Sequence, residues 1–339
     1  MHGIEYLNQP GFTGESWNVL YGCDGCELSR PRDKGTRCWA ELQMPRQRKH
    51  TPEPDLVIRD GKWTGEVHLM PSRLSIPLRW QDPRMIAVQF MGDLFARNTP
   101  FEYIAAVHGV AAATPHHRYI SLTKSVKRLE EYGRWIVRQI APAELCKRHA
   151  EIRTRDQSAS VGWYQGTMDY PLPNWIQGIS ATCQRTLEHR WPYLARFPAR
   201  HRVISLTPRE SIDLKRLIRN PHAGPNPYES DDEFQVAMQA QVLPDLIILD
   251  CAAGPNAWPT DMEWIRSIIR QCRDLGIGVR IKQVGSRPLL IHPGNNDGCG
   301  TIEWRGSGGR WEGHPIDRSG GDPLEWPEDI RIRDWMEGF

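Results

Sequence analysis

The chain has 339 residues, 39% of them hydrophobic, and its 43 lysine and arginine residues nearly balance 41 aspartate and glutamate residues. The formal charge of +2 does not favour a nucleic-acid coat, and no run approaches the roughly 18 apolar residues of a membrane span. The first residues also lack the basic-then-apolar pattern of a secretory signal. We therefore expect a cytoplasmic protein with a sizeable core and no membrane partner.

Short apolar runs rich in β-branched residues alternate with longer amphipathic stretches along most of the chain. Strands are predicted at 16–22, 84–93, 118–125, 174–180, 201–210, 244–254 and 277–285. Helices are predicted at 99–115, 126–140, 181–197, 211–220 and 262–276. At the start of the first helix, Thr99 is placed to cap it, with Pro100 in the first helical position. This alternation is typical of repeated β-α units and a parallel sheet.

The fold class expected from this pattern is α/β, as a partial or complete parallel β/α barrel. A doubly wound open sheet is less favoured because no Gly-x-Gly-x-x-Gly turn opens any of the helices. We expect the barrel to occupy residues 1–285, with insertions near 41–83 and 141–173. The first insertion contains "RDGKWTGE", a loop or small hairpin, and the glycine- and tryptophan-rich residues 286–339 are expected to form an irregular C-terminal cap.

Three cysteines cluster near the start of the chain, and the other five are scattered. Cys23 and Cys26 supply half of a zinc site, Cys38 adds a third ligand, and a fourth ligand would have to come from His50, Cys299 or another distant group. A [4Fe-4S] cluster accepts the same soft thiolates and keeps one iron open when only three cysteines bind it. The spacing alone favours zinc, whereas the position directly after the first predicted strand favours a cluster.

Several short blocks resemble, in order, a bacteriophage-associated family of unknown function whose members resemble radical S-adenosylmethionine enzymes. The first block, "SWNVLYGCDGCELSRPRDKGTRCWAE", is similar to the family's opening "W-N-P-x-x-G-C... C-Y-A-E". The other blocks are "LSIPLRWQDPRMIAVQFMGDLFA" at 74–96, "YISLTKSVKRLEEY" at 119–132, "LPNWIQGIS" at 172–180 and "CRDLGIGVRIKQVG" at 272–285. The resemblance implies a β/α barrel with a [4Fe-4S] cluster and S-adenosylmethionine, but it does not supply a reaction.

Two carboxylates that this family usually carries are missing. Thr207 stands where the family has a glutamate in "S-x-E-P-L", and Asp250 begins the stretch that replaces "G-G-E-S-G". Asp250 and Glu210 could compensate from neighbouring positions. Otherwise this chain has a changed substrate or reduced activity.

The expected cofactor and substrate residues follow from the C-terminal ends of the strands, where barrel active sites lie. Gly92 and Asp93 end the second strand, where radical enzymes hold the methionine amino group with a "GGE"-like turn, and Ser180 ends a later strand. We assign these three residues to S-adenosylmethionine. Asp93 could instead cap the helix that follows it.

Three charged residues are expected to face the substrate. Lys124 offers a positive charge to a carboxylate or phosphate, although it could equally be a solvated helix start. Lys282 alternates with Ile281 in an apolar strand, so it points into the barrel and requires a carboxylate or ligand partner. Asp250 ends the preceding sheet strand.

Together these features favour a radical S-adenosylmethionine-type enzyme, encoded by a phage or mobile element and acting in the bacterial host cytoplasm. Cys23, Cys26 and Cys38 would bind the cluster, a reductant protein would supply electrons, and the substrate would be a nucleotide or nucleic-acid base. The alternative is a barrel stabilised by zinc or a cluster that binds partners without radical chemistry. A hydrolase is less favoured because no acidic cluster with two-metal spacing occurs.

Overall fold

Seven strands form one parallel sheet in the computed structural model, in the order β1-β6-β7-β8-β9-β10-β12. The structure describes residues 7–29, 38–47, 53–154, 166, 169–219, 242–253, 257–289, 303–306, 309–312 and 321–334. Because the strands follow one another in chain order, the sheet is compatible with a partial parallel β/α barrel. None of the described helices is long and apolar enough to cross a membrane.

The elements of the sheet agree closely with the predicted alternation. The strands are β1 (Thr13–Ser16), β6 (Arg84–Val88), β7 (Arg118–Thr123), β8 (Trp175–Ala181), β9 (His201–Leu206), β10 (Leu246–Asp250) and β12 (Gly278–Gln283). The helices that connect them are α3 (Phe101–Ala113), α4 (Val126–Val137), α5 (Pro142–Thr154), α6 (Gln184–Arg196), α7 (Lys215–Arg219) and α9 (Met262–Leu275). The helix α5 occupies the first part of the insertion predicted at 141–173.

Short 3-10 helices lie at Pro71–Arg73, Pro77–Arg79, Pro323–Glu325 and Glu328–Ile330. Further short strands and α-helices complete the described chain. They are β2 (Leu20–Tyr21), α1 (Trp39–Gln47), α2 (Pro54–Val57), β3 (Ile58–Arg59), β4 (Lys62–Trp63), β5 (His68–Leu69), β11 (Thr260–Asp261), β13 (Pro288–Leu289), β14 (Glu303–Gly306) and β15 (Gly309–Glu312). Contacts divide the chain into unit 1, Met1–Arg32, Arg37–Gly178 and Arg196–His201, and unit 2, Asp33–Thr36, Ile179–Ala195 and Arg202–Phe339.

Two predicted boundaries are wrong. The first sheet strand spans residues 13–16 rather than 16–22, because Leu20 and Tyr21 pair antiparallel with β5 outside the main sheet. Thr99 does not cap α3, because the carbonyl of Pro100 accepts the first helical N–H, from Ile104, at 3.1 Å. Both errors have the same origin: local patterns identify apolar strands and helix starts but not their hydrogen-bond partners.

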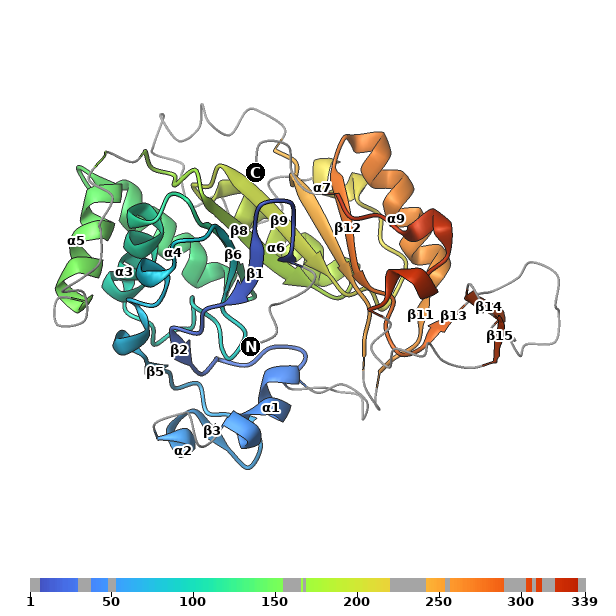
Figure 1. The fold of residues 1–339 in the computed structure, drawn as a ribbon, viewed down its shortest axis with the longest axis horizontal. Helices are drawn as coiled ribbons and strands as arrows, with labels where there is room; N and C mark the ends of the chain where they lie inside the picture. Colours follow the sequence, from blue (N-terminus) through green and yellow to red (C-terminus); the bar gives the residue numbers. More distant parts are fainter. Residues whose placement is uncertain are drawn as a thin grey trace. The chain divides into compact units, whose positions relative to one another are not determined.

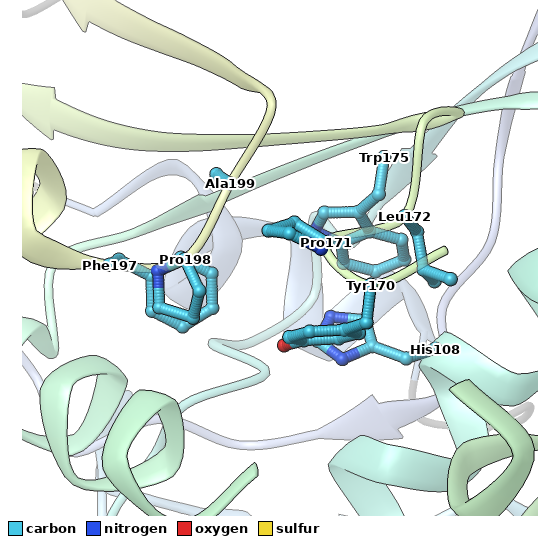
Figure 2. A pocket seen from close by; sticks show the side chains of 8 residues that line it. All are labelled: His108, Tyr170, Pro171, Leu172, Trp175, Phe197, Pro198 and Ala199. Atoms are coloured by element: carbon cyan, nitrogen blue, oxygen red, sulfur yellow. The ribbon is translucent and has the colours of Figure 1, made fainter. Parts of the chain in front are cut away.

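In unit 1, α3 is buried on nearly all sides, as its run of alanine and other apolar residues allows. It packs along α5, and Figure 1 shows α3, α4 and α5 gathered beside β6. His108 lies within α3, is 2% exposed, and its Nδ1 is 2.6 Å from the hydroxyl of Tyr132. A small pocket next to this histidine is lined by His108, Tyr170, Pro171, Leu172, Trp175, Phe197, Pro198 and Ala199 (Figure 2).

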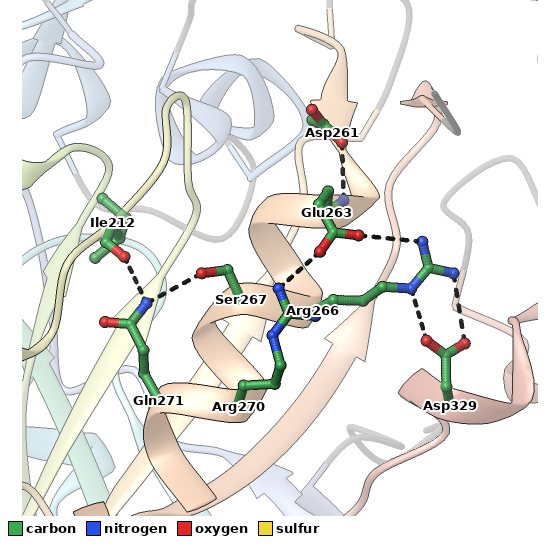
Figure 3. A network of polar contacts seen from close by, with 8 residues as sticks. All are labelled: Ile212, Asp261, Glu263, Arg266, Ser267, Arg270, Gln271 and Asp329. Atoms are coloured by element: carbon green, nitrogen blue, oxygen red, sulfur yellow. Dashed lines mark hydrogen bonds and ion pairs between the residues drawn. The ribbon is translucent and has the colours of Figure 1, made fainter. Parts of the chain in front are cut away.

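In unit 2, the amphipathic helix α9 begins at an N-cap, where Asp261 accepts the N–H of Glu263 at 2.8 Å. On its exposed face Arg266 pairs with Asp329 at 2.6 Å, part of the network in Figure 3. This ion pair attaches residues 321–334 of the predicted cap, in which Trp326 is fully buried. The same segment continues onto β12, where Ile281 donates its N–H to the carbonyl of Ile332 at 2.9 Å.

Two buried histidines make the stability of the fold depend on pH. Burial lowers the pKa of His108 to about 3, and burial together with the neighbouring His116 lowers that of His117 to about 4. His117 Nδ1 accepts the N–H of Arg84, so protonation there would break a buried hydrogen bond. Below about pH 6.5 the unfolded chain therefore binds more protons than the folded one, which lowers the free energy of unfolding.

We expect the free energy of unfolding to fall by up to about 1.4 kcal/mol per pH unit for each of these histidines as the pH decreases from about 6.5 to about 5. Urea unfolding at a series of pH values measures this slope. The variant His117→Gln should have a shallower slope than the unaltered chain. A slope that the substitution leaves unchanged would contradict the assignment.

Candidate functional site

The cysteine loop, residues 22–29, is fixed to the segment that follows β6. The contact lies where the backbone at Gly22 crosses the backbone at Gly92. The N–H of Gly22 donates to the carbonyl of Met91 at 3.2 Å, and the N–H of Asp93 donates to the carbonyl of Gly22 at 3.1 Å. A Cβ on Gly92 would overlap the carbonyl oxygen of Gly22, and a Cβ on Gly22 would overlap that of Glu66. These overlaps mean that both positions require glycine. Gly22 also has a φ of +114°, which residues with a side chain rarely adopt.

Asp93 extends this attachment to the end of β7. It is 5% exposed, and its carboxylate accepts the hydroxyl of Thr123 at 2.7 and 2.9 Å and the N–H of Lys124 at 3.0 Å. It also accepts the N–H of Phe95 at 3.0 Å and the hydroxyl of Ser125 at 3.3 Å. Asp93 does not cap α3, which begins at residue 101. Its oxygens are engaged by protein donors, and a cofactor role for Gly92 and Asp93 stays a prediction.

The three clustered cysteines lie in unit 1 as half-buried, free thiols. Cys23 and Cys26 lie on the cysteine loop, where Cys26 Sγ accepts the N–H of Leu28 at 3.4 Å. Cys38 lies at the start of α1, and its carbonyl accepts the N–H of Leu42 at 3.2 Å. The structure therefore brings the three thiols from two separate segments into one region of unit 1, close enough for their charges to interact.

Burial dominates the acid-base behaviour of the loop cysteines. It raises the pKa of Cys23, and the nearby Asp93 carboxylate raises it further. Burial also raises the pKa of Cys26, but the positive charge of Lys124 acts in the opposite direction. Without a metal the thiols are therefore protonated near neutral pH, and a bound metal would have to displace their protons.

Lys124 is placed beside the cysteines by the end of β7. It is half-buried, and no hydrogen bond or ion pair to its ammonium group occurs within the part of the chain that the structure describes. Its positive charge lies near enough to Cys26 to lower the pKa of that thiol against the effect of burial. The structure thus brings together six of the nine predicted site residues in unit 1: Cys23, Cys26, Cys38, Gly92, Asp93 and Lys124.

Among the described residues, no group of three or more histidine, cysteine, aspartate or glutamate side chains is close enough to hold a single metal ion. His50 and Cys299, the named candidates for a fourth zinc ligand, lie outside the described residues. The zinc interpretation therefore gains no fourth ligand from the described chain. The soft thiol donors fit zinc and iron-sulfur clusters alike in their chemistry.

The other three predicted site residues lie in unit 2. Lys282 Nζ is 2.8 Å from Asp250 Oδ2, so the lysine on the apolar strand has the carboxylate partner that its position requires. The pair joins the C-terminal ends of β10 and β12, next to a register shift in the pairing of these strands. The other oxygen, Asp250 Oδ1, is buried and has no hydrogen-bond partner within the described part of the chain. This unpartnered acceptor suits a ligand N–H or O–H group.

Ser180 and Glu210 have contacts that the sequence does not reveal. The carbonyl of Ser180 accepts a hydrogen bond from Arg190 at 2.6 Å, within unit 2. Glu210 is exposed and accepts the N–H of Gln184, the first residue of α6, at 2.7 Å. Glu210 thus satisfies a helix N-terminus, and its role in place of the carboxylate replaced by Thr207 stays a prediction.

Sequence reasoning missed Lys62, which contacts both cysteine-bearing segments, and its partner Glu41. Glu41 is 3% exposed, and Lys62 Nζ lies 3.6 Å from its Oε2. The Asp60-Gly61 pair is a strong hairpin signal that predicts the turn carrying Lys62. Nothing in the local pattern identifies the partners of either side chain.

We expect Lys124→Met to raise the pKa of Cys26 further, because the substitution removes the cation that opposes the effect of burial. Alkylation of Cys26 by iodoacetamide near pH 8 should slow by about threefold in the metal-free protein, since the thiolate is the reactive form. Peptide mass mapping measures the rate at this cysteine. Lys127→Met, on the exposed face of α4, is the control and should leave the rate unchanged. Equal rates in all three proteins would show that Lys124 does not influence Cys26.

We expect Asp93→Asn to lower the free energy of unfolding by about 2 to 3 kcal/mol, because an amide group would face donors that now bind a carboxylate. Urea unfolding measures the loss. Asp82→Asn, at an exposed aspartate, should change stability by less than about 0.5 kcal/mol. An Asp93 variant as stable as the control would contradict the role of this carboxylate in joining β6 to β7.

Comparison with known proteins identifies the chain at the level of a family. The profile of a family described as "Protein of unknown function (DUF5131)" matches residues 8–301. No curated protein and no solved structure matches the chain. The family match carries no information on phage association or on S-adenosylmethionine chemistry. Since it covers most of the sequence, the chain belongs to the DUF5131 family.

Proposed function

We propose that this chain is an iron-sulfur enzyme of the radical S-adenosylmethionine type, built on a partial β/α barrel. The observation that carries the proposal is the gathering of Cys23, Cys26 and Cys38 in one half-buried region beside the positive charge of Lys124. In this proposal the three thiolates bind three irons of a [4Fe-4S] cluster, and the fourth iron stays open for S-adenosylmethionine.

The arrangement of the thiols supports a cluster over a single zinc ion. A cluster distributes its ligands over separate irons, so it accepts thiols that are farther apart than the ligands of one ion. The three cysteines lie on two separate segments of unit 1, Cys23 and Cys26 on the cysteine loop and Cys38 at the start of α1. Three cysteines, with no fourth ligand found beside them among the described residues, suit a cluster with one open iron better than a closed tetrahedral site.

The chain's own residues would prepare the site in three ways. Lys124 favours the thiolate form of Cys26, which metal binding requires. Asp93 holds the cysteine loop and the end of β7 in place. Gly92 has no side chain, so the backbone of Gly22 can lie directly against it. When bound, a reduced cluster supplies the electron that cleaves S-adenosylmethionine into methionine and a 5'-deoxyadenosyl radical.

We propose that the substrate binds at the ion pair of Lys282 and Asp250 in unit 2. Lys282 offers a cation and Asp250 Oδ1 a buried acceptor, which suit a polar substrate with both donor and acceptor groups. Nucleotides and nucleic-acid bases carry such groups, so they are the substrate class we propose. The proposal further includes a reductant protein of the bacterial cytoplasm and a phage or mobile element as the source.

The test is cleavage of S-adenosylmethionine after anaerobic reconstitution with iron and sulfide and reduction with dithionite. We expect 5'-deoxyadenosine to form, and Cys38→Ala to reduce its yield by at least about tenfold because the cluster loses one of three ligands. Cys183→Ala, which changes a half-buried cysteine outside the site, is the control and should keep the activity.

A reconstituted protein that forms no 5'-deoxyadenosine would favour the second candidate function, a metal-stabilised scaffold without radical chemistry. Thr207 in place of a glutamate, together with Glu210 engaged at α6, is the observation that supports this candidate. A colourless protein that binds zinc and leaves S-adenosylmethionine intact would establish it and exclude the radical enzyme.

A further inference from the structure

The two segments that carry the cysteines must keep a fixed separation if their thiols are to bind one metal group. One segment is the cysteine loop, and the other is the start of α1, which carries Cys38. We propose that Lys62 and Glu41 form a clamp that sets this separation before any metal binds, and that both are positioning residues. The inference rests on the proposed function for the identity of the metal group, but not for the geometry of the clamp.

Lys62 holds the end of the cysteine loop. Its Nζ donates a hydrogen bond to the carbonyl of Ser29 at 2.7 Å. The N–H of Ser29 in turn donates to the carbonyl of Cys26 at 3.0 Å, which closes the turn that begins at this cysteine. A single charged donor therefore restrains the turn on which Cys26 lies.

Glu41 holds the helix that carries Cys38. Its side chain is 1% exposed, Oε1 accepts the N–H of Trp63 at 3.1 Å, and Oε2 lies 3.6 Å from Lys62 Nζ. A buried carboxylate requires a compensating charge, which Lys62 supplies. Because Glu41 follows Cys38 by about one helical turn, fixing this carboxylate also fixes the start of α1.

The hairpin of β3 and β4 places Lys62 between the two segments. Asp60 and Gly61 both have positive φ, 50° and 70°, as a two-residue hairpin turn requires. The hairpin rests on an apolar cluster of Tyr21, Met44, Val57, Ile58, Met70 and Met91, against which Trp63 packs. Tyr21 and Met91 immediately precede the crossing glycines Gly22 and Gly92. Figure 1 shows α1, α2 and β3 together in this part of unit 1.

It follows that the insertion predicted at 41–83 is part of the cysteine site. The Ser29–Lys62–Glu41 contacts connect the segments of Cys26 and Cys38 without a metal ligand. A site whose ligands are already held together binds its metal group with less loss of conformational freedom than one that must be assembled.

The test measures the distance between the segments in the metal-free protein. A short bifunctional maleimide is added under reducing, anaerobic conditions, and mass mapping gives the yield of the cross-link between Cys38 and Cys23 or Cys26. We expect Lys62→Met to lower this yield by about threefold, the effect of losing one half-exposed charged contact, and Lys62→Arg to restore it. Glu41→Gln keeps an acceptor for Trp63 and should lower the yield through loss of charge alone.

Arg59→Met is the matched control, because Arg59 lies opposite Lys62 in the same hairpin and is exposed. Far-UV circular dichroism and the melting temperature confirm that each variant is folded. A Lys62→Met yield equal to that of the unaltered chain, or an equal loss in Arg59→Met, would overturn the clamp.

A second readout, the iron and sulfide bound after reconstitution, separates the clamp from the proposed function. If the unaltered chain binds no cluster but Lys62→Met still lowers cross-linking, the clamp holds and the proposed function fails. If the unaltered chain cleaves S-adenosylmethionine and Lys62→Met matches it in cross-linking and iron content, the function holds and the clamp fails.

Discussion

The crossing of the backbone at Gly22 and Gly92 is the constraint on which the cysteine site depends. Two hydrogen bonds join the cysteine loop to the end of β6 at this crossing, and neither position has room for a Cβ. The sheet strand β6 therefore determines where Cys23 and Cys26 lie. The next residue, Asp93, accepts the N–H of Lys124 at the end of β7. This hydrogen bond holds Lys124 near Cys26. An inflexible sheet thus supports a loop that would otherwise be free to move.

The surroundings of Cys23 and Cys26 disfavour the thiolate form that metal binding requires. Burial and the Asp93 carboxylate raise the pKa of Cys23, whereas the charge of Lys124 and the backbone N–H of Leu28 act against the rise at Cys26. Protonated loop cysteines are a suitable resting state for the proposed site, because their protons would leave as a metal group entered. In unit 2, Asp250 and Lys282 balance one another, and among the residues that the structure describes nothing donates to the second carboxylate oxygen.

The sequence predicts the order of the sheet strands because each strand is a short apolar run between helices, and the Asp60-Gly61 pair predicts a hairpin that the structure contains. It also predicts that Lys282 needs a carboxylate partner, which the structure supplies as Asp250. It could not predict that Leu20 and Tyr21 pair with β5, that Asp93 binds Thr123, or that Lys62 reaches both Ser29 and Glu41. These contacts join residues distant in the chain, and only the folded arrangement of the strands brings them together.

The metal content of the anaerobically reconstituted protein decides whether Cys23, Cys26 and Cys38 bind the proposed iron-sulfur cluster. Iron and acid-labile sulfide should each approach about four per chain, with an electron paramagnetic resonance signal after reduction that changes when S-adenosylmethionine is added. Binding of zinc in preference to iron, or of iron without sulfide, would contradict the proposed cluster. The three cysteines would then form a structural metal site.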